Sequence, residues 1–231
     1  MRNVNSSRTI SFLFSCVLLL VSLPVLAAPS TLSVIPYDQI TYKAKSDIRI
    51  DSGDLWIDAI KGTDLWTSAD GKDNNHELPR LLFEPKGDFI FSAKVTPDFN
   101  SAYDGGALIL FGDGLHWAKL LFEQFKSGDT GVASTVSRGF GDDVYHGVVT
   151  AKSHYLKIVR RDKLIVFYRS DDGKSWHMLR NFGFGPGTGS GFEGPISIGF
   201  SAQSPISEHH DVHFSDIRFE EKTFKDFWQG E

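Results

Sequence analysis

Apolar and polar residues alternate with a period of two along most of the chain after residue 30. A period of two places successive side chains on opposite faces of an extended strand, so the pattern predicts β-strands. The alternation is clearest in residues 88–96, 155–159, 164–168 and 196–203. Turn-forming sequences such as Asp70-Gly71 and Asp113-Gly114 separate these runs. We expect about 12–14 strands between residues 31 and 219, because all-β domains place a turn every ~8–12 residues.

The predicted strands indicate an all-β fold. Several of them are apolar on both faces, and a sheet of so many strands normally divides into two packed layers. The sequence therefore predicts one two-sheet antiparallel β-sandwich of jelly-roll type over about residues 30–222. The glycine-rich run 183–194 indicates one long surface loop. The tail, Lys222 to Gln229, is the one candidate for a helix, because Phe224, Phe227 and Trp228 fall on one side of a helical turn.

The first 27 residues have the pattern of a secretory signal peptide. Two arginines precede an almost wholly apolar run over residues 10–26, and Val25-Leu26-Ala27 supplies small residues before a cleavage point. An uncleaved membrane anchor and a lipoprotein built on Cys16 are the alternatives. We therefore expect residues 28–231 to form a single exported domain with a short C-terminal tail, located in the periplasm or outside the cell, without a membrane anchor after cleavage.

Composition excludes some functions. The 231 residues include 24 Lys and Arg against 29 Asp and Glu, which gives a net charge of −5. Removal of residues 1–27 takes away two arginines and no acidic residue, so the mature charge is −7. No basic excess neutralises phosphates, and we do not expect nucleic-acid binding. The single cysteine, Cys16, lies in the leader, so thiol chemistry and cysteine-based zinc sites are not expected in the mature chain.

Residues 115–125 form the strand with the most informative chemistry. Trp117, Lys119 and Glu123 share one of its faces, because side chains alternate along a strand. An indole beside an ammonium and a carboxylate is typical of a sugar-binding surface, where the ring stacks on the sugar and charged groups bind hydroxyls. The alternative is a solvent-exposed sheet face with cross-strand ion pairs.

Two further segments carry candidate ligand-binding residues. Ser134 and Arg138 lie on one face of a strand that runs into a glycine-rich turn with Asp142. The planar guanidinium of an arginine suits a carboxylate or a sugar acid, whereas aspartate at that position also forms turns. Asp104 precedes the strand 107–111, where it either fixes the backbone or reaches into a cleft.

Neither a metal site nor a catalytic motif is evident. His209, Asp211 and His213 share a strand face and could bind zinc, but residues two and four apart on one strand are spread too widely for one ion. Calcium at the acidic turn Asp51-Ser52-Gly53-Asp54 is a second possibility. We expect no resident metal and no other cofactor. No strand carries the paired carboxylates of a glycoside hydrolase, and a serine-nucleophile elbow and a phosphate loop are both absent.

The chain resembles a domain-of-unknown-function family in the concanavalin A-like lectin/glucanase superfamily, some members of which are labelled "regulation of enolase". The resemblance covers about residues 50–219. The strings that carry it are Gly53-Asp54-Leu55-Trp56-Ile57, Thr63-Asp64-Leu65-Trp66, Gly87-Asp88-Phe89, Tyr103-Asp104-Gly105-Gly106-Ala107-Leu108, Trp117-Ala118-Lys119-Leu120-Leu121-Phe122-Glu123, Ser134-Thr135-Val136 and Phe214-Ser215-Asp216-Ile217-Arg218-Phe219.

The resemblance implies a concanavalin A-like jelly roll with a concave face, similar to the accessory domain at the C-terminus of some β-xylosidases. Trp117, Lys119 and Glu123 would lie on or near that face. Members of the family often have a tryptophan after the Ser-Asp that follows the Ser-Thr-Val strand. This chain lacks it, and Tyr145 is the aromatic residue that could substitute. Most comparable members are cytoplasmic, whereas this chain carries a leader.

The sequence therefore predicts an exported carbohydrate-binding protein that uses a concave Trp/Lys/Glu face. One alternative is a glycoside hydrolase or polysaccharide lyase acting on an exported glycan. For a lyase, Lys119, Arg138, Tyr145 and His146 are plausible parts. The other alternative is an envelope domain that binds a protein partner. The sequence leaves the question of catalysis open and favours a binding protein over an enzyme. Any enzyme would be a carbohydrate-active hydrolase or lyase.

Overall fold

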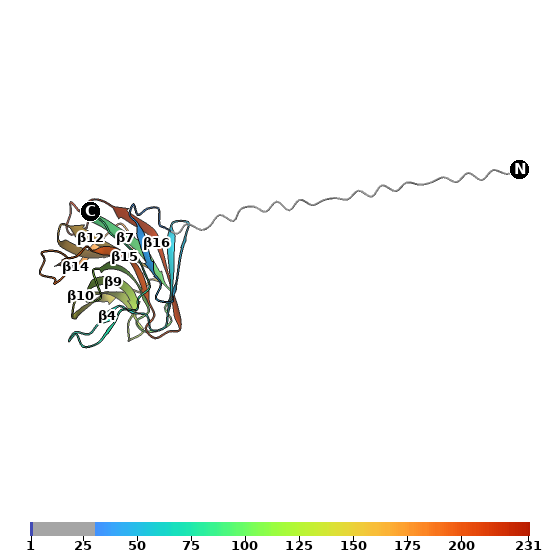
Figure 1. Cartoon of the computed structure of the whole chain (residues 1–231), viewed down its shortest axis with the longest axis horizontal. Coiled ribbons are helices and arrows are strands. Elements are labelled where there is room, and N and C mark those ends of the chain that lie inside the picture. Colours follow the sequence, from blue (N-terminus) through green and yellow to red (C-terminus); the bar gives the residue numbers. More distant parts are fainter. Residues whose placement is uncertain (2–30) are drawn as a thin grey trace.

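The computed structural model describes residues 31–231, together with Met1 (Figure 1). The predicted signal peptide and Cys16 lie outside the described residues. Residues 31–231 contain no helix that is long and apolar enough to cross a membrane. Their sixteen strands are β1 (Gln39–Tyr42), β2 (Asp47–Asp51), β3 (Asp54–Ile60), β4 (Trp66–Thr67), β5 (Asn74–Asn75), β6 (Arg80–Phe83), β7 (Phe89–Pro97), β8 (Gly105–Phe111), β9 (His116–Gln124), β10 (Thr130–Arg138), β11 (Gly141–Val148), β12 (His154–Arg161), β13 (Leu164–Ser170), β14 (His177–Gly183), β15 (Ser197–Gln203) and β16 (His209–Glu220).

Fourteen of these strands form two antiparallel sheets of seven that pack as two layers (Figure 1). The front sheet has the order β1-β6-β15-β8-β9-β10-β11, and the back sheet has the order β14-β13-β12-β7-β16-β3-β2. β4 and β5 pair separately as a short hairpin. The predicted two-sheet antiparallel sandwich is confirmed. The chain has more strands than the pattern predicted, because two-residue strands such as β4 are too short to show alternation.

Phenylalanines from both sheets fill the space between the layers. Phe91 on β7 and Phe200 on β15 meet edge to face with ring centroids 5.0 Å apart, and Phe200 makes a second such contact with Phe214 on β16. Aromatic pairs prefer this geometry, which adds about 0.5–1.5 kcal/mol to the burial of each ring. The main core therefore links the two sheets through side chains that the period-two pattern places inward.

The C-terminal tail is not a helix, so that prediction was wrong. Its backbone carbonyls accept hydrogen bonds from side chains of the back sheet. The Tyr168 hydroxyl donates to the carbonyl of Phe227 over 2.6 Å, and Lys157 Nζ donates to the carbonyl of Gly230 over 3.0 Å. Phe224 packs into a cluster with Tyr168 and Trp176 on the outer face of that sheet. Those contacts replace the intrahelical hydrogen bonds that a tail of ten residues would otherwise need.

Residues 61–80, which include the β4–β5 hairpin, cover part of the outer face of the front sheet. Leu65 and Leu78 from this segment form a second buried cluster with Trp117 and Leu121 of β9. The segment thus hides one end of β9 and leaves the other end, toward Glu123, beside an opening. This arrangement positions the candidate site.

Candidate functional site

A pocket of about 370 Å³ opens on the outer face of the front sheet. We call it the front pocket. It is lined by Asp64, Trp66, Tyr103, Lys119, Leu121, Glu123, Ala133, Ser134, Thr135, Asp143, Val144, Tyr145 and Gln203. These residues come from β9, β10, β11 and β15 and from the segments around residues 64 and 103.

Small residues lie beside Glu123 and Leu121 on the floor of the pocket. Glu123 lies opposite Gly105 on β8 and opposite Gly131 on β10. A Cβ atom added at Gly105 would lie only 2.9 Å from the Cβ of Glu123. One row away, Leu121 lies between Ala107 and Ala133. Ala133 lines the pocket, and the missing side chain at Gly131 leaves room for the Phe125 ring that supports Tyr145.

Lys119 forms the ionic part of the floor. Its side chain is 5% exposed, and its Nζ donates hydrogen bonds to Gln203 Oε1 over 2.8 Å and to Asp64 Oδ1 over 3.1 Å. The Nζ atom also lies 5.8 Å from the centroid of the Trp117 ring. A buried ammonium needs such partners, since leaving one unpaired in a dry site is costly. Lys119 is therefore a fixed positive charge at the bottom of the pocket.

Glu123 is the most perturbed group in the pocket. Its side chain is 7% exposed. Burial raises the pKa of Glu123 to about 7, the positive charge of Lys119 opposes this shift, and the negative charges of Asp64 and Asp143 add to it. No hydrogen bond from the described residues contributes to that pKa. The carboxyl group is therefore free to bind a ligand, and it changes protonation state near neutral pH.

Aromatic side chains form the rim above this polar floor. Tyr145 on β11 is 65% exposed, and its ring is held edge to face by Phe125 with centroids 5.0 Å apart. Trp66 on β4 is 38% exposed. Tyr103 adopts a positive φ of 70°, directly before Asp104. Exposed aromatic rings beside a buried polar floor give a ligand an apolar surface to stack on and hydrogen-bonding groups below it.

Of the eight residues that the sequence proposed as ligand-binding, the structure brings Lys119, Glu123 and Tyr145 together in the front pocket. Trp117 shares their sheet face as predicted, but it is fully buried beneath Leu65 and Leu78. The prediction of Trp117 as an open stacking surface is corrected, because the segment 61–80 covers its ring. Its indole N–H donates to the carbonyl of Gly114 over 3.2 Å.

The polar groups of the Ser134, Arg138 and Asp142 side chains have partners outside the front pocket. Ser134 borders the pocket, but its hydroxyl lies 2.8 Å from His146 Nε2, on the strand face that Val132 and Val136 turn toward the core. Side-chain alternation separates that face from the one carrying Thr135, so Ser134 and Arg138 share a strand face as predicted, but it is the inner face of the sheet.

The same alternation explains Arg138 and Asp142. Arg138 donates to the carbonyl of Gly183 over 2.7 Å, and Asp142 pairs with Arg180 on β14 over 2.9 Å. Both residues therefore connect the edges of the two sheets and do not face the pocket. Asp143, the neighbour of Asp142, is the acidic residue that faces it, and it accepts a hydrogen bond from the Thr135 hydroxyl.

Asp104 fixes the backbone, which is one of the two roles that the sequence predicted for it. Its side chain is fully buried, where it accepts hydrogen bonds from the backbone N–H groups of Asn100 and Ser101 at 3.0 and 2.8 Å. It also accepts one from the hydroxyl of Ser207 at 2.7 Å. These bonds fix the loop that carries Tyr103, so Asp104 supports the rim and does not reach into the pocket.

Sequence reasoning missed Asp64, Trp66, Tyr103, Asp143 and Gln203 as a group. Asp64, Trp66 and Tyr103 stand in strings that carried the family resemblance, and Gln203 ends a strand recognised by its alternation. They lie on four separate segments, however, and only the packing of the segment 61–80 and of β15 beside β8 brings them together.

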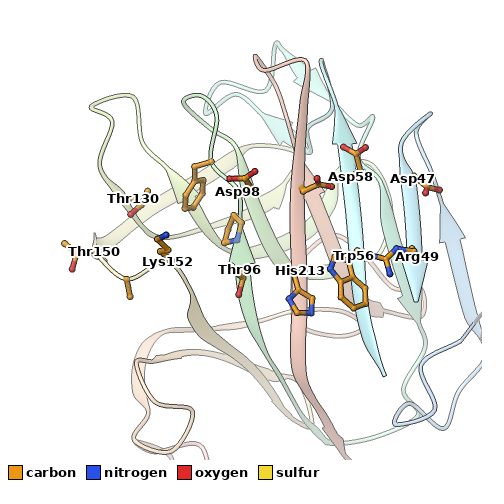
Figure 2. A pocket seen from close by; sticks show the side chains of 14 residues that line it. Asp47, Arg49, Trp56, Asp58, Thr96, Asp98, Thr130, Thr150, Lys152 and His213 are labelled. Atoms are coloured by element: carbon orange, nitrogen blue, oxygen red, sulfur yellow. The ribbon is translucent and has the colours of Figure 1, made fainter. Parts of the chain in front are cut away.

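A second and larger pocket of about 810 Å³ lies on the outer face of the back sheet (Figure 2). Arg49, Trp56 and His213 form a row across β2, β3 and β16. The guanidinium carbon of Arg49 lies 4.2 Å from the Trp56 ring centroid, and the His213 ring stacks on that indole with centroids 4.4 Å apart. Both faces of the indole are therefore covered, and this pocket offers no free ring for a sugar.

Acidic groups gather beside that row. His209, Asp211 and His213 share the outer face of β16 as predicted. His213 contacts Asp54 over 2.8 Å and takes no part in a ligand set, whereas candidate ligand atoms of Asp58, His209 and Asp211 lie within 4.8 Å of one another. Burial and the nearby charge of Asp211 raise the pKa of Asp58. The candidate ligand atoms thus come from two strands, β3 for Asp58 and β16 for His209 and Asp211.

The fold and the front pocket define a concanavalin A-like β-sandwich protein. The chain belongs to the family described as "Protein of unknown function (DUF1349)", which matches residues 42–222. The family resemblance inferred from the sequence is confirmed. No curated protein matches the sequence.

Solved structures share the fold at low sequence identity. A functionally unknown protein from Saccharomyces cerevisiae is 19% identical with a TM-score of 0.68, and the match covers 80% of this chain and 95% of that one. A xylan β-1,4-xylosidase from Bacillus halodurans is 14% identical with a TM-score of 0.55, and the match covers 73% of this chain and 33% of the enzyme. Lectin I-B4 from Griffonia simplicifolia is 12% identical with a TM-score of 0.52, over 79% and 92% of the two chains.

Proposed function

We propose that this protein binds carbohydrate in the front pocket. The observation that carries the proposal is the aromatic rim above a buried polar floor, in which Trp66 and Tyr145 are exposed and Tyr103 is half-buried. Sugars present an apolar ring face and a belt of hydroxyls, and this pocket offers a matching surface for each. A volume of about 370 Å³ lies within the ~300–1,000 Å³ that is usual for small-molecule sites.

Each part of the pocket has a role in this proposal. Tyr145 and Trp66 stack on the sugar ring. Lys119 and Gln203 are already hydrogen-bonded to each other, so they hold a fixed geometry in which the remaining Nζ proton and the amide group meet hydroxyls. The lectin and the xylosidase with this fold support the proposal by analogy of architecture, since the concanavalin A-like sandwich is found in proteins with those names. No cofactor is part of the proposal.

The test is a glycan array probed with residues 28–231 and with two variants. Tyr145→Ala removes a rim ring that is 65% exposed, and Trp228→Ala removes a ring that is 67% exposed in the C-terminal tail, away from the pocket. We expect Tyr145→Ala to weaken binding by about 1–3 kcal/mol, on the scale of aromatic–base stacking, and Trp228→Ala to leave it unchanged. Absence of glycan binding by the folded wild-type protein would contradict the proposal and favour a protein partner.

Export is part of the proposal. The leader pattern of residues 1–27 predicts cleavage after Ala27 and a location in the periplasm or outside the cell. The measurement is the intact mass of the protein recovered from periplasm, medium and cytoplasm. A mature chain that begins at Ala28 in the first two fractions is expected, and an intact leader on cytoplasmic protein would contradict export.

A second candidate function is glycoside hydrolysis, favoured by one observation. Burial raises the pKa of Glu123 to about 7, which suits a general acid, and Asp64 and Asp143 are near enough to add to that shift. A carboxylic acid and a nearby carboxylate are the groups such enzymes use. A lyase is less well supported, because Arg138 and His146 face away from Lys119 and Tyr145.

Hydrolysis predicts the release of reducing ends from a glycan that binds. Glu123→Gln would then abolish release while retaining binding, because the amide keeps the shape of the side chain but cannot donate the proton. Asp142→Asn, which changes an acidic residue outside the pocket, is the matched control. If the wild-type protein binds a glycan without releasing reducing ends, hydrolysis is contradicted and only the binding function is retained.

A further inference from the structure

The front pocket contains more negative than positive charge. Its carboxyl groups belong to Asp64, Glu123 and Asp143, and its one ammonium group belongs to Lys119. Lys119 is already paired with Asp64 at 3.1 Å. Asp143 takes a hydrogen bond from a neutral hydroxyl, that of Thr135. When Glu123 is ionised, the pocket therefore carries two negative charges that no cation of the pocket balances.

Among the carboxyl groups of the front pocket, Glu123 is the one without a hydrogen bond from the described residues. It is more than nine-tenths buried, and its two cross-strand neighbours, Gly105 and Gly131, have no side chains that could reach it. A carboxylate buried without a cation or hydrogen-bond donor is costly to keep in a fold. Nearby side chains on a sheet face commonly provide such groups, but here one cross-strand neighbour has no side chain and the space at the other is taken by the apolar ring of Phe125.

We infer that the front pocket selects amino sugars, whose protonated amine lies between Glu123 and Asp143 while the sugar ring stacks on the aromatic rim. The inference rests on the proposed function and names its ligand class. An ammonium group supplies both the positive charge and the hydrogen-bond donors that Glu123 lacks. An N-acetylated or neutral sugar supplies donors but no charge, so it leaves the excess negative charge of the pocket uncompensated.

Proton release distinguishes these ligands. The groups that face Glu123 are Lys119 on its own strand, Asp143 and Tyr145 on β11, and Asp64 on the covering segment. Burial raises the pKa of Glu123 to about 7, so most of its carboxyls are protonated at pH 6. A bound ammonium favours the ionised form, so binding of an amino sugar expels that proton. Binding of a neutral sugar does not.

The experiment compares three tetrasaccharides by titration calorimetry with residues 28–231: fully deacetylated glucosamine, N-acetylglucosamine and xylose oligomers. Titrations at pH 6 in two buffers of different ionisation enthalpy give the number of protons released. We expect up to about one proton per site for the glucosamine oligomer and none for the other two.

Glu123→Gln is the decisive variant, and Asp142→Asn is its matched control because it removes the same charge from a residue outside the pocket. Glu123→Gln should abolish proton release and reduce the preference for the amine about tenfold, while Asp142→Asn should change neither. Equal or tighter binding of the acetylated or xylose oligomer would overturn the amino-sugar inference and keep the carbohydrate function. If the folded protein binds none of the three oligomers and no glycan on the array, both the amino-sugar inference and the carbohydrate function are overturned.

Discussion

Glu123 and Gln203 lie in one row across the front sheet, on opposite sides of Gly105. The row matters because it links two groups with different tasks: Gln203 holds Lys119 in place, and Glu123 is left without a partner from the sheet. A larger residue at position 105 would separate them with a side chain. The glycine between these two polar residues thus keeps them adjacent, while Asp64, Trp66 and Tyr103 complete the pocket from the segments around it.

Gly105→Ala should therefore damage both packing and the pocket. The added Cβ would lie 2.9 Å from the Cβ of Glu123 and 3.1 Å from the carbonyl oxygen of Phe122, so the backbone or Glu123 must shift. Overpacking of this kind costs about 1–3 kcal/mol of unfolding free energy, and the shift should also weaken glycan binding. Urea unfolding measures the first effect. Gly87→Ala is the control, because nothing lies within 4 Å of its added Cβ; equal stability of the two variants would contradict the close approach.

Trp117→Ala should act on stability and not directly on a ligand. The indole is fully buried under Leu65 and Leu78, so its removal leaves a cavity and should cost about 3–5 kcal/mol of unfolding free energy. Trp66→Ala, at a partly exposed rim position, should cost far less stability and should weaken glycan binding. Denaturant unfolding of both variants separates the two cases. A wild-type midpoint for Trp117→Ala would show that the ring is not covered.

The sequence predicted the fold well because strand periodicity is a local property. The alternation in residues 88–96 and 196–203 corresponds to β7 and β15, and the Asp-Gly turn at residues 113–114 lies between β8 and β9 as expected. The C-terminal tail was predicted incorrectly because its side-chain pattern fits one helical turn, while its conformation is decided by hydrogen bonds to Lys157 and Tyr168.

The candidate site was only partly predictable. Alternation placed Lys119 and Glu123 on one face correctly, since that inference needs only one strand. The same rule could not show that residues 61–80 cover Trp117, nor that Ser134 belongs to the inner face, because both facts depend on which face of the sheet meets the core. Asp64 and Gln203 lie far from Lys119 in the sequence, and no local pattern connects three such segments.

Two histidines, the half-buried His146 and the buried His154, make the fold sensitive to acid. Burial lowers the pKa of His146 and of His154 to about 4. The unfolded chain therefore binds more protons than the folded protein between about pH 6.5 and pH 4, and stability falls as the pH decreases through that range. His154→Leu should remove the part of this decrease in unfolding free energy that His154 causes, up to about 3 kcal/mol. The check is the unfolding free energy of wild type and variant at pH 7 and pH 4.5; a constant difference between them would contradict the buried neutral ring.

Glu123 has the opposite effect on stability, and its contribution can be isolated. Because burial raises its pKa to about 7, the folded protein binds more protons than the unfolded chain between about pH 4.5 and pH 7. Stability from this group is complete below pH 4.5 and is lost as the pH rises to 7, by up to about 3 kcal/mol. Glu123→Gln cannot ionise and should not show this loss.

The measurement is urea unfolding of wild type and Glu123→Gln at pH 5 and pH 8, because the histidine contributions cancel in the difference between the two proteins. We expect the variant to be close to wild type at pH 5 and clearly more stable at pH 8. A saturating ligand that supplies an ammonium group should remove much of the difference at pH 8, since it stabilises the ionised carboxyl of the wild-type protein. If the two proteins instead differ equally at both pH values without ligand, Glu123 is not held in a dry, unpartnered position, and the charge argument for the pocket fails with it.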